Sequence, residues 1–420
     1  MNSKSESVPS ARTILIVLSA MIALGPLAID AYLPSFPRIA LDLGVDTVAV
    51  GYSLSAYMFG MALGQLFGGP ISDQIGRKRI ATTGLTLFFV MSLVIIYVQS
   101  LDQLIIARAL QAIGGGLAGA VVMPTLRDIS RPEQVASRIA VVFLIMLGAP
   151  LVAPVFGVFL MQLGWRWIFG FLGIYAFLML IIYLFRIPET ARSETKKIRF
   201  KKIIVQYLFV IKHRTDGARY PIRYGLSVAF TNCIMLIYVT NASFIYQTYF
   251  GVSDAVFPLF FGANVVGLGI VQSFSANYLR NRDLQGVAAY FRFGQRLQLV
   301  MVTLMALAIF FTDINLWVFV PLIICSLSCL GINGSSGSGL FISAFKAHSG
   351  SASALLSTLS VMLGAALGCI SGYLNQGDLT SFISMMLFAT VVGNLLMMTI
   401  PKKREKEVLR KIQSGEIEAA

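Results

Sequence analysis

Residues 68–79 read GGPISDQIGRKR and lie where one long apolar run, 48–71, gives way to the next, 80–99. The loop carries three consecutive basic residues, whereas each run has about 20 residues, the length that crosses the hydrocarbon core of a bilayer as an α-helix. Backbone amides inside a bilayer must be bonded within their own segment, so both runs are expected to be helical. The loop therefore predicts a tight reversal between two transmembrane helices.

The same pattern extends along the chain and predicts twelve spans. They are 13–34, 48–71, 80–99, 103–126, 138–163, 168–186, 222–247, 255–279, 290–311, 316–340, 353–374 and 381–400. Composition agrees, since 57% of the residues are apolar and only 12% are charged, about half the charged share of a soluble domain. We expect an all-α membrane protein with six spans in residues 13–186, a basic cytosolic linker in 187–221 and six spans in 222–400.

Basic residues lie almost entirely on alternate sides of these spans. Of the 33 Lys and Arg residues, thirty fall in segments on one side, Arg38 and Arg166 fall on the other, and Arg108 lies inside a span. Because cytoplasmic loops accumulate Lys and Arg, the N-terminus, 1–12, and the charged tail, 401–420, are predicted to be cytoplasmic. The net charge of +14 is spread over short loops that face anionic lipid, so nucleic acid is not an expected partner.

The linker contains apolar residues at helical spacing with lysines beside them. They are Ile203, Ile204, Tyr207, Leu208 and Ile211, next to Lys201, Lys202 and Lys212. Two interpretations are open at this point: a helix that lies on the cytosolic membrane surface, and a solvated linker helix.

The residue types in loop 68–79 suit a close reversal. Glycine and proline allow helices to approach closely, an acid can accept bonds from a neighbouring helix N-terminus, and the basic triplet anchors the loop at the headgroups. The segment resembles the signature loop between helices 2 and 3 of the major facilitator superfamily, G-x-x-x-D-R/K-x-G-R/K-R/K, with Gln74 in place of the usual basic residue. The resemblance implies a gating role for Gly69, Asp73, Gly76, Arg77 and Lys78. A loop that only sets topology explains the basic triplet but not the acid and glycine at fixed offsets.

Further segments narrow the resemblance. They read IDAYLPSFP at 29–37, RALQAIGGG at 108–116, GWRWIF at 164–169, PET at 188–190 and SGSASALL at 349–356. Together they resemble the bicyclomycin/chloramphenicol-resistance (Bcr/CflA) subfamily of proton-coupled drug exporters. The resemblance implies the major facilitator fold, with 12 transmembrane helices in two pseudo-symmetric six-helix bundles, in the cell inner membrane.

Asp30 and Arg108 are the two charges predicted to lie within spans and to couple protons. Asp30 is expected about four residues from the end of span 13–34, at about the depth of Arg108 in span 103–126. An ionisable residue inside a span marks a functional site by default. Burial favours a neutral carboxyl group, whereas a nearby guanidinium favours a charged one, so approach and separation of the two would release and load a proton. The alternatives are an interfacial Asp30 and an Arg108 that bonds backbone carbonyls of the first span.

Span 138–163 carries two prolines on one helix face, flanked by glycines. The resemblance implies an antiport hinge at Gly148, Pro150, Pro154 and Gly157, while an ordinary kink is the alternative. Polar residues inside the spans are candidates for the lining of a substrate cavity, although each is equally suited to bonding between helices. They are Tyr32, Tyr57, Gln111, Asn232, Asn241 and Asn264.

The favoured function is export of amphipathic small molecules, such as bicyclomycin or chloramphenicol-like drugs, in exchange for protons. Export of a native metabolite such as a siderophore or an amino acid, and proton-coupled uptake, remain open. The chain is expected to work as a monomer in the lipid bilayer. No cofactor or metal is expected, because the sequence has no G-x-x-x-x-G-K-S/T loop for ATP and its two His are far apart. A membrane-embedded enzyme is not expected, since no nucleophile with a base and no cluster of carboxylates lies in the spans.

Overall fold

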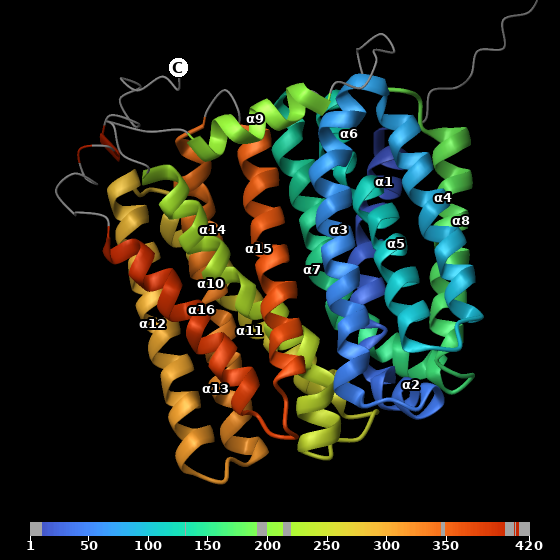
Figure 1. Cartoon of the computed structure of the whole chain (residues 1–420). Coiled ribbons are helices and arrows are strands. Elements are labelled where there is room, and N and C mark those ends of the chain that lie inside the picture. The colour runs from blue at the N-terminus through green and yellow to red at the C-terminus, as the bar shows by residue number, and fades with distance from the viewer. Residues whose placement is uncertain are drawn as a thin grey trace, which may run out of the picture. The chain divides into compact units, whose positions relative to one another are not determined.

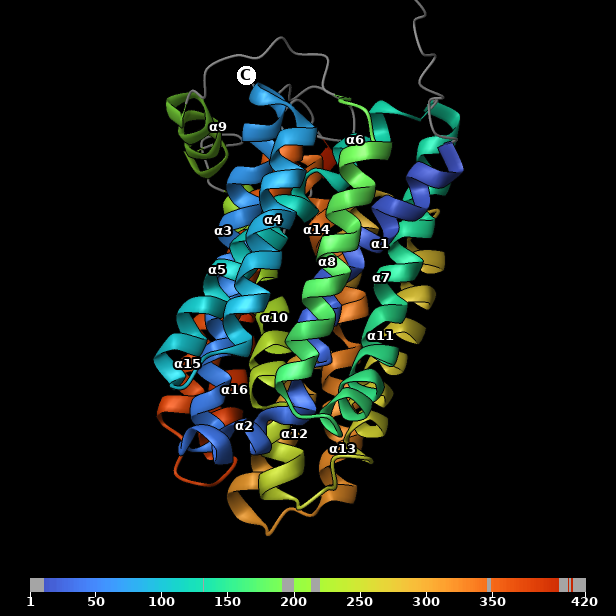
Figure 2. The same cartoon turned by 90° about the vertical axis from the view of Figure 1, so that its right-hand side faces the viewer.

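The computed structural model describes residues 11–130, 132–190, 200–212, 220–345, 349–399, 407, 409 and 410. The predicted cytosolic N-terminus, charged tail and linker lie partly or largely outside these residues. Every regular element within them is a helix (Figures 1 and 2), as predicted. Among the described residues, eleven helical stretches are long and apolar enough to cross a membrane. The twelfth predicted span, 138–163, falls in α7 (Pro132–Met161), a single helix of 30 residues.

Contacts divide the chain into two units, Met1–Leu43 with Ala56–Arg199, and Gly44–Ser55 with Phe200–Ala420. The described helices of unit 1, besides α7, are α1 (Ala11–Asp30), η1 (Leu33–Ser35), α2 (Phe36–Leu43), α3 (Thr47–Ile75, whose first turns belong to unit 2), α4 (Arg77–Ile96), α5 (Leu101–Ala120), α6 (Val122–Asp128) and α8 (Arg166–Arg186).

Glycines bring α5 into backbone contact with two neighbours. A Cβ on Gly114 would lie 2.6 Å from the carbonyl oxygen of Gly84 in α4, and one on Gly116 would lie 2.4 Å from that of Met61 in α3. Small residues allow such close packing between membrane helices. In Figure 1, α4 and α5 run side by side, and α8 covers the other side of α4. The glycine run 114–116 therefore fixes α5, and with it Arg108, inside unit 1.

Unit 2 has the same all-helical construction. Its described helices are α9 (Phe200–Lys212), α10 (Tyr220–Ser243), the π-helix η2 (Phe244–Tyr249), α11 (Phe257–Leu279), α12 (Leu284–Phe311), α13 (Leu316–Ser328), α14 (Leu330–Ser343), α15 (Ser349–Tyr373) and α16 (Thr380–Met398). The glycine-rich stretch 331–339 has the composition of a flexible linker, yet it forms most of α14. A Cβ on Gly331 would lie 2.6 Å from the backbone nitrogen of Gln272, so the glycine serves close packing on α11.

The first predicted span, 13–34, lies within an apolar helical stretch that continues to Leu43. This stretch is not one uninterrupted helix, because α1 ends at Asp30 and the chain then turns through η1 into α2. Pro34 and Pro37 explain the break, because proline is favoured at the start of a helix and not inside one. Asp30 is therefore the last residue of α1, where the helix ends.

Candidate functional site

Arg108 is fully buried within unit 1 and reaches the last turn of α1. Its Nη2 donates a hydrogen bond to the carbonyl oxygen of Ala28 over 3.0 Å, and its Nη1 donates one to Oε1 of Gln111 over 2.7 Å. The fixed fork of a guanidinium suits two such bonds at once. Arg108 thereby ties α5 to α1 two residues before Asp30.

Gln111 extends these bonds to α4. Its Nε2 donates to Oγ of Ser92 over 2.7 Å, and that hydroxyl donates to the carbonyl oxygen of Phe88. Both ends of the Gln111 amide are thus bonded to protein, although Gln111 was predicted to line a substrate cavity. Ser92 was not predicted at all, because a lone serine in an apolar run gives no signal of its partner.

Three aromatic rings surround the guanidinium. The Arg108 Cζ lies 4.1 Å from the ring centroid of Tyr57, 4.7 Å from that of Tyr32 and 5.4 Å from that of Phe169. A ring face attracts a cation by about 2 kcal/mol when both are out of water. Buried atoms without a hydrogen-bond partner among the described residues include Nε of Arg108 and the hydroxyl of Tyr57. The charge is therefore held mainly by ring faces and neutral acceptors.

Asp30 lies beside this cluster but does not pair with Arg108. Its side chain is 6% exposed, and no ion pair joins the two residues in the described part of the chain, where the guanidinium bonds the backbone of α1 instead. The sequence predicted that Asp30 and Arg108 lie at a similar depth, with an Arg108 that bonds backbone carbonyls of the first span as the alternative to a pair. The structure brings them to the same turn of α1 without an ion pair.

The glycine-proline face of α7 packs against the end of α1. Pro150, Pro154 and Gly157 recur at helical spacing on one face. A Cβ on Gly157 would lie 2.0 Å from the carbonyl oxygen of Ala31, the residue after Asp30, whereas one on Gly148 would meet nothing within 4 Å. The predicted hinge therefore contacts α1 next to the predicted proton site, through Gly157 and not through Gly148 (Figure 2 shows α1 beside α7).

Replacing Gly157 by Ala is expected to lower the unfolding free energy by about 1–3 kcal/mol, the usual effect of overpacking. The new methyl group collides with backbone, so α7 and α1 must separate. Gly148→Ala is the matched control on the same helix, and it is expected to leave stability unchanged or slightly higher, since alanine favours a helix. Thermal unfolding of the two purified variants checks the difference. Equal stability would show that α7 is free to shift at this contact.

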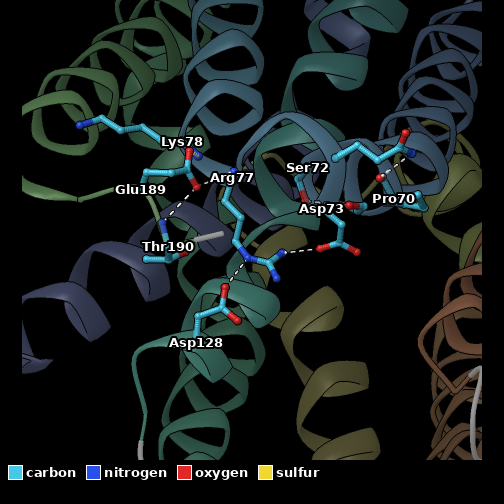
Figure 3. A network of polar contacts seen from close by, with 10 residues as sticks. Pro70, Ser72, Asp73, Arg77, Lys78, Asp128, Glu189 and Thr190 are labelled. Carbon is cyan, nitrogen blue, oxygen red and sulfur yellow. Dashed lines mark hydrogen bonds and ion pairs between the residues drawn. The ribbon is translucent and has the colours of Figure 1, made fainter. Parts of the chain in front are cut away.

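The signature loop forms a second polar cluster in unit 1, in which Arg77 lies between two carboxylates (Figure 3). Its Nη1 lies 3.0 Å from Oδ1 of Asp73, and its Nε donates to Oδ2 of Asp128 at the end of α6. Asp73 was expected to accept bonds from a neighbouring helix N-terminus. Within unit 1 its described partner is Arg77, and its side chain is 62% exposed.

Glu189 is the acid that binds the N-terminus of α4. Its Oε1 accepts from the backbone N–H of Arg77 over 2.9 Å, and its Oε2 accepts from that of Lys78 over 3.1 Å (Figure 3). A carboxylate is favourable there because the first N–H groups of a helix are unpaired and its N-terminus is partly positive. The chain after α8 is thereby attached to the signature loop, a link that no local spacing reveals across 112 residues.

Gly76 is required by this arrangement. Its φ is +111°, and a Cβ there would lie 2.5 Å from Oε2 of Glu189. Gly76→Ala is expected to lower the unfolding free energy by about 1–3 kcal/mol, because only glycine adopts this backbone region without strain. Gly69→Ala is the matched control, since Gly69 lies in α3 and a Cβ there meets nothing within 4 Å. Thermal unfolding that ranks the two variants equally would contradict the account.

The candidate cavity residues of unit 2 do not form one cluster. Asn264 donates to the hydroxyl of Tyr238 over 2.9 Å, and Asn241 donates to the carbonyl oxygen of Ile237 over 2.8 Å. Asn232 is half-buried and nine residues before Asn241, which places the two on opposite faces of α10. The four cysteines are free, and the described residues contain no group of ligands suited to a metal.

The family described as Major Facilitator Superfamily matches residues 18–369. The MFS-type transporter YdgK of Bacillus subtilis, itself uncharacterized, is 30% identical over 94% of this chain and 96% of its own length. The bicyclomycin resistance protein homolog of Haemophilus influenzae is 28% identical over 91% of this chain and 94% of its own. A crystal structure of the peptide transporter POT with sulfate has a similar fold, with a TM-score of 0.72 and 14% identity over 97% of this chain and 96% of that one.

Proposed function

The chain belongs to the major facilitator superfamily and is a multi-pass membrane transporter, not an enzyme; from this premise we propose that it exports amphipathic small molecules in exchange for protons. The observation that carries the proposal is the buried carboxyl group of Asp30 at the end of α1, beside an Arg108 that it does not pair with. A carboxyl group inside a membrane protein loses the hydration that it would have in water, which costs free energy. Acids in such positions are typical of proton pathways.

The arrangement supports a proton switch. Apolar burial and the negative end of helix α1 both disfavour a free carboxylate, so Asp30 holds a proton while Arg108 bonds the carbonyl of Ala28. A movement that carries the guanidinium from that carbonyl to the carboxyl group favours the charged form and releases the proton. The two positions lie within one turn of α1, so a small shift of α5 against α1 is sufficient.

We assign the hinge to α7 and the gate to the signature loop. The contact between Gly157 and Ala31 transmits a bend of α7 to the end of α1 that carries Asp30. Arg77, Asp73 and Asp128 hold the ends of α3, α4 and α6 together in the arrangement of Figure 3, and a state change has to break some of these bonds. In this proposal the signature loop faces the cytosol, because the Lys and Arg residues gather on its side of the spans. The protein lies in the cell inner membrane and transports as a monomer.

Drugs such as bicyclomycin or chloramphenicol-like compounds are the proposed substrates. The relative from Haemophilus influenzae is named for bicyclomycin resistance and covers nearly the whole chain. Of the candidate cavity residues, Tyr32 and Tyr57 of unit 1 hold the Arg108 guanidinium against their rings. In unit 2, Asn264 has an oxygen without a hydrogen-bond partner among the described residues, and a single polar group of this kind suits a ligand that is mostly apolar.

Transport into everted membrane vesicles tests the proposal. Vesicles with the protein are energised to an acidic interior and given labelled bicyclomycin, chloramphenicol, a siderophore or an amino acid, with and without a protonophore. Accumulation of a drug that the protonophore abolishes supports drug export. Accumulation of only the siderophore or amino acid identifies a metabolite exporter, and efflux from preloaded vesicles identifies an uptake symporter. Accumulation that persists with the protonophore would contradict proton coupling.

A further inference from the structure

Helix α9 has two apolar faces, and only one of them is covered. Ile203, Tyr207 and Val210 are buried, with exposures of 1%, 9% and 0%. They recur at helical spacing, and α9 contacts α15 of the same unit, running crosswise over its N-terminal end (Figure 1). This inner face is therefore a packing surface, and α9 is fixed to unit 2.

The opposite side of α9 is apolar and exposed. Ile204 is 51% exposed, Val205 54%, Leu208 42% and Ile211 39%. An exposed group of large apolar side chains on one helix face marks an interaction surface. We call this side, with the lysines described next, the outer face of α9.

Lysines flank the apolar part of the outer face at both ends. Lys201, Val205, Leu208 and Lys212 follow one another at spacings of four, three and four residues, so they form one stripe along the helix. The two lysines are about 16 Å apart along the axis. Both are exposed, and neither has a carboxylate partner within the described ranges. A lysine at each end of an apolar stripe is the pattern of a helix that lies in a membrane interface.

We propose that the outer face of α9 binds anionic phospholipid headgroups. The apolar side chains enter the boundary between headgroups and acyl chains, and the lysine ammonium groups bind the phosphates. Charge complementarity selects anionic lipid over a protein partner, because the stripe carries two positive and no negative groups and lies on an element that already covers the end of a membrane-spanning helix. The linker helix is thus a lipid anchor of unit 2, and this role is independent of what the protein transports.

Lipid retention by the intact protein tests this anchor. The full-length protein is reconstituted in nanodiscs of equal parts phosphatidylcholine and phosphatidylglycerol, released, and analysed by native mass spectrometry for the ratio of the two retained lipids. The wild-type protein is expected to retain phosphatidylglycerol in preference. In K201Q/K212Q the preference falls by about fivefold for each lysine removed. K201R/K212R keeps the charges and is expected to keep the preference.

R280Q/R282Q is the matched control, because it removes two exposed basic residues from the loop between α11 and α12 of the same unit. Residues 280–283 of this loop include no apolar side chain that would enter the headgroup boundary, so R280Q/R282Q is expected to lower the preference less than K201Q/K212Q does. An unchanged preference in K201Q/K212Q would show that the outer face is exposed to solvent or binds a protein, and does not bind lipid headgroups. An equal fall in R280Q/R282Q would show a general effect of charge. Either result overturns the proposal.

Discussion

Asp30→Asn is expected to abolish proton-coupled export while the protein still inserts and folds. Asparagine has nearly the same shape and fits the same buried position, but it cannot bind and release a proton. A proton that moves inward through 100 mV supplies about 2.3 kcal/mol, which sustains roughly a fiftyfold gradient of a neutral substrate. The variant loses this gradient, and labelled drug in energised proteoliposomes should equilibrate or stay outside.

Asp42→Asn is the control for loss of an acid. Asp42 lies in α2 and accepts a hydrogen bond from Nη1 of Arg166 over 2.6 Å and one from Nε1 of Trp165 over 3.1 Å, away from Arg108. Its replacement should weaken this contact and leave the coupling intact. Full coupling in Asp30→Asn, or equal losses in both variants, would remove Asp30 from the mechanism.

Arg108→Met is expected to end transport with little change in stability. The guanidinium is buried without a carboxylate partner, so its removal relieves the cost of a charge held out of water. Against this stand the lost attraction of three ring faces and two acceptors left unpaired, on Ala28 and Gln111, at about 1–3 kcal/mol each. These effects oppose one another, and we expect the unfolding free energy to stay within about 2 kcal/mol of the wild type. Transport should fall to background, because no positive charge remains to displace the proton of Asp30.

Arg108→Lys separates charge from geometry. Lysine keeps the positive charge but has no planar fork for the simultaneous bonds to Ala28 and Gln111. Partial proton coupling in this variant, with none in the methionine variant, would assign the role to the charge. If Arg108 were purely structural, Arg108→Met would instead lower the unfolding free energy by more than about 4 kcal/mol, the range of a severely destabilising substitution. Thermal unfolding and vesicle transport on the same preparations distinguish these outcomes.

The spans could be predicted because a bilayer fixes the length and composition of whatever crosses it. Features that depend on contacts with another part of the chain could not be predicted in this way. The end of α1 at Asp30 follows from Pro34 and Pro37, yet prolines occur inside membrane helices as well, and α7 continues through Pro150 and Pro154. Sequence alone does not say which prolines end a helix.

The charged residues of the candidate site could be identified from the sequence, but the hydrogen bonds that they make could not. Counting intramembrane charges identifies Asp30 and Arg108, whereas the carbonyl of Ala28 has no signature and becomes a partner only once α1 and α5 adjoin. The same holds for Glu189, an acid in a loop whose partners at the start of α4 are more than a hundred residues away. Long-range contacts of this kind depend on which helices pack together, and a single sequence does not encode that in any local pattern.

Proton release on substrate binding tests the central claim most directly. Purified wild-type protein and Asp30→Asn, in weakly buffered detergent solution with a pH-sensitive dye, are mixed with whichever of bicyclomycin and chloramphenicol the vesicles accumulate. Our account predicts that the drug displaces protons from the wild-type protein and none from the variant. Equal release from both proteins, or no release from wild-type protein that binds the drug, would contradict it.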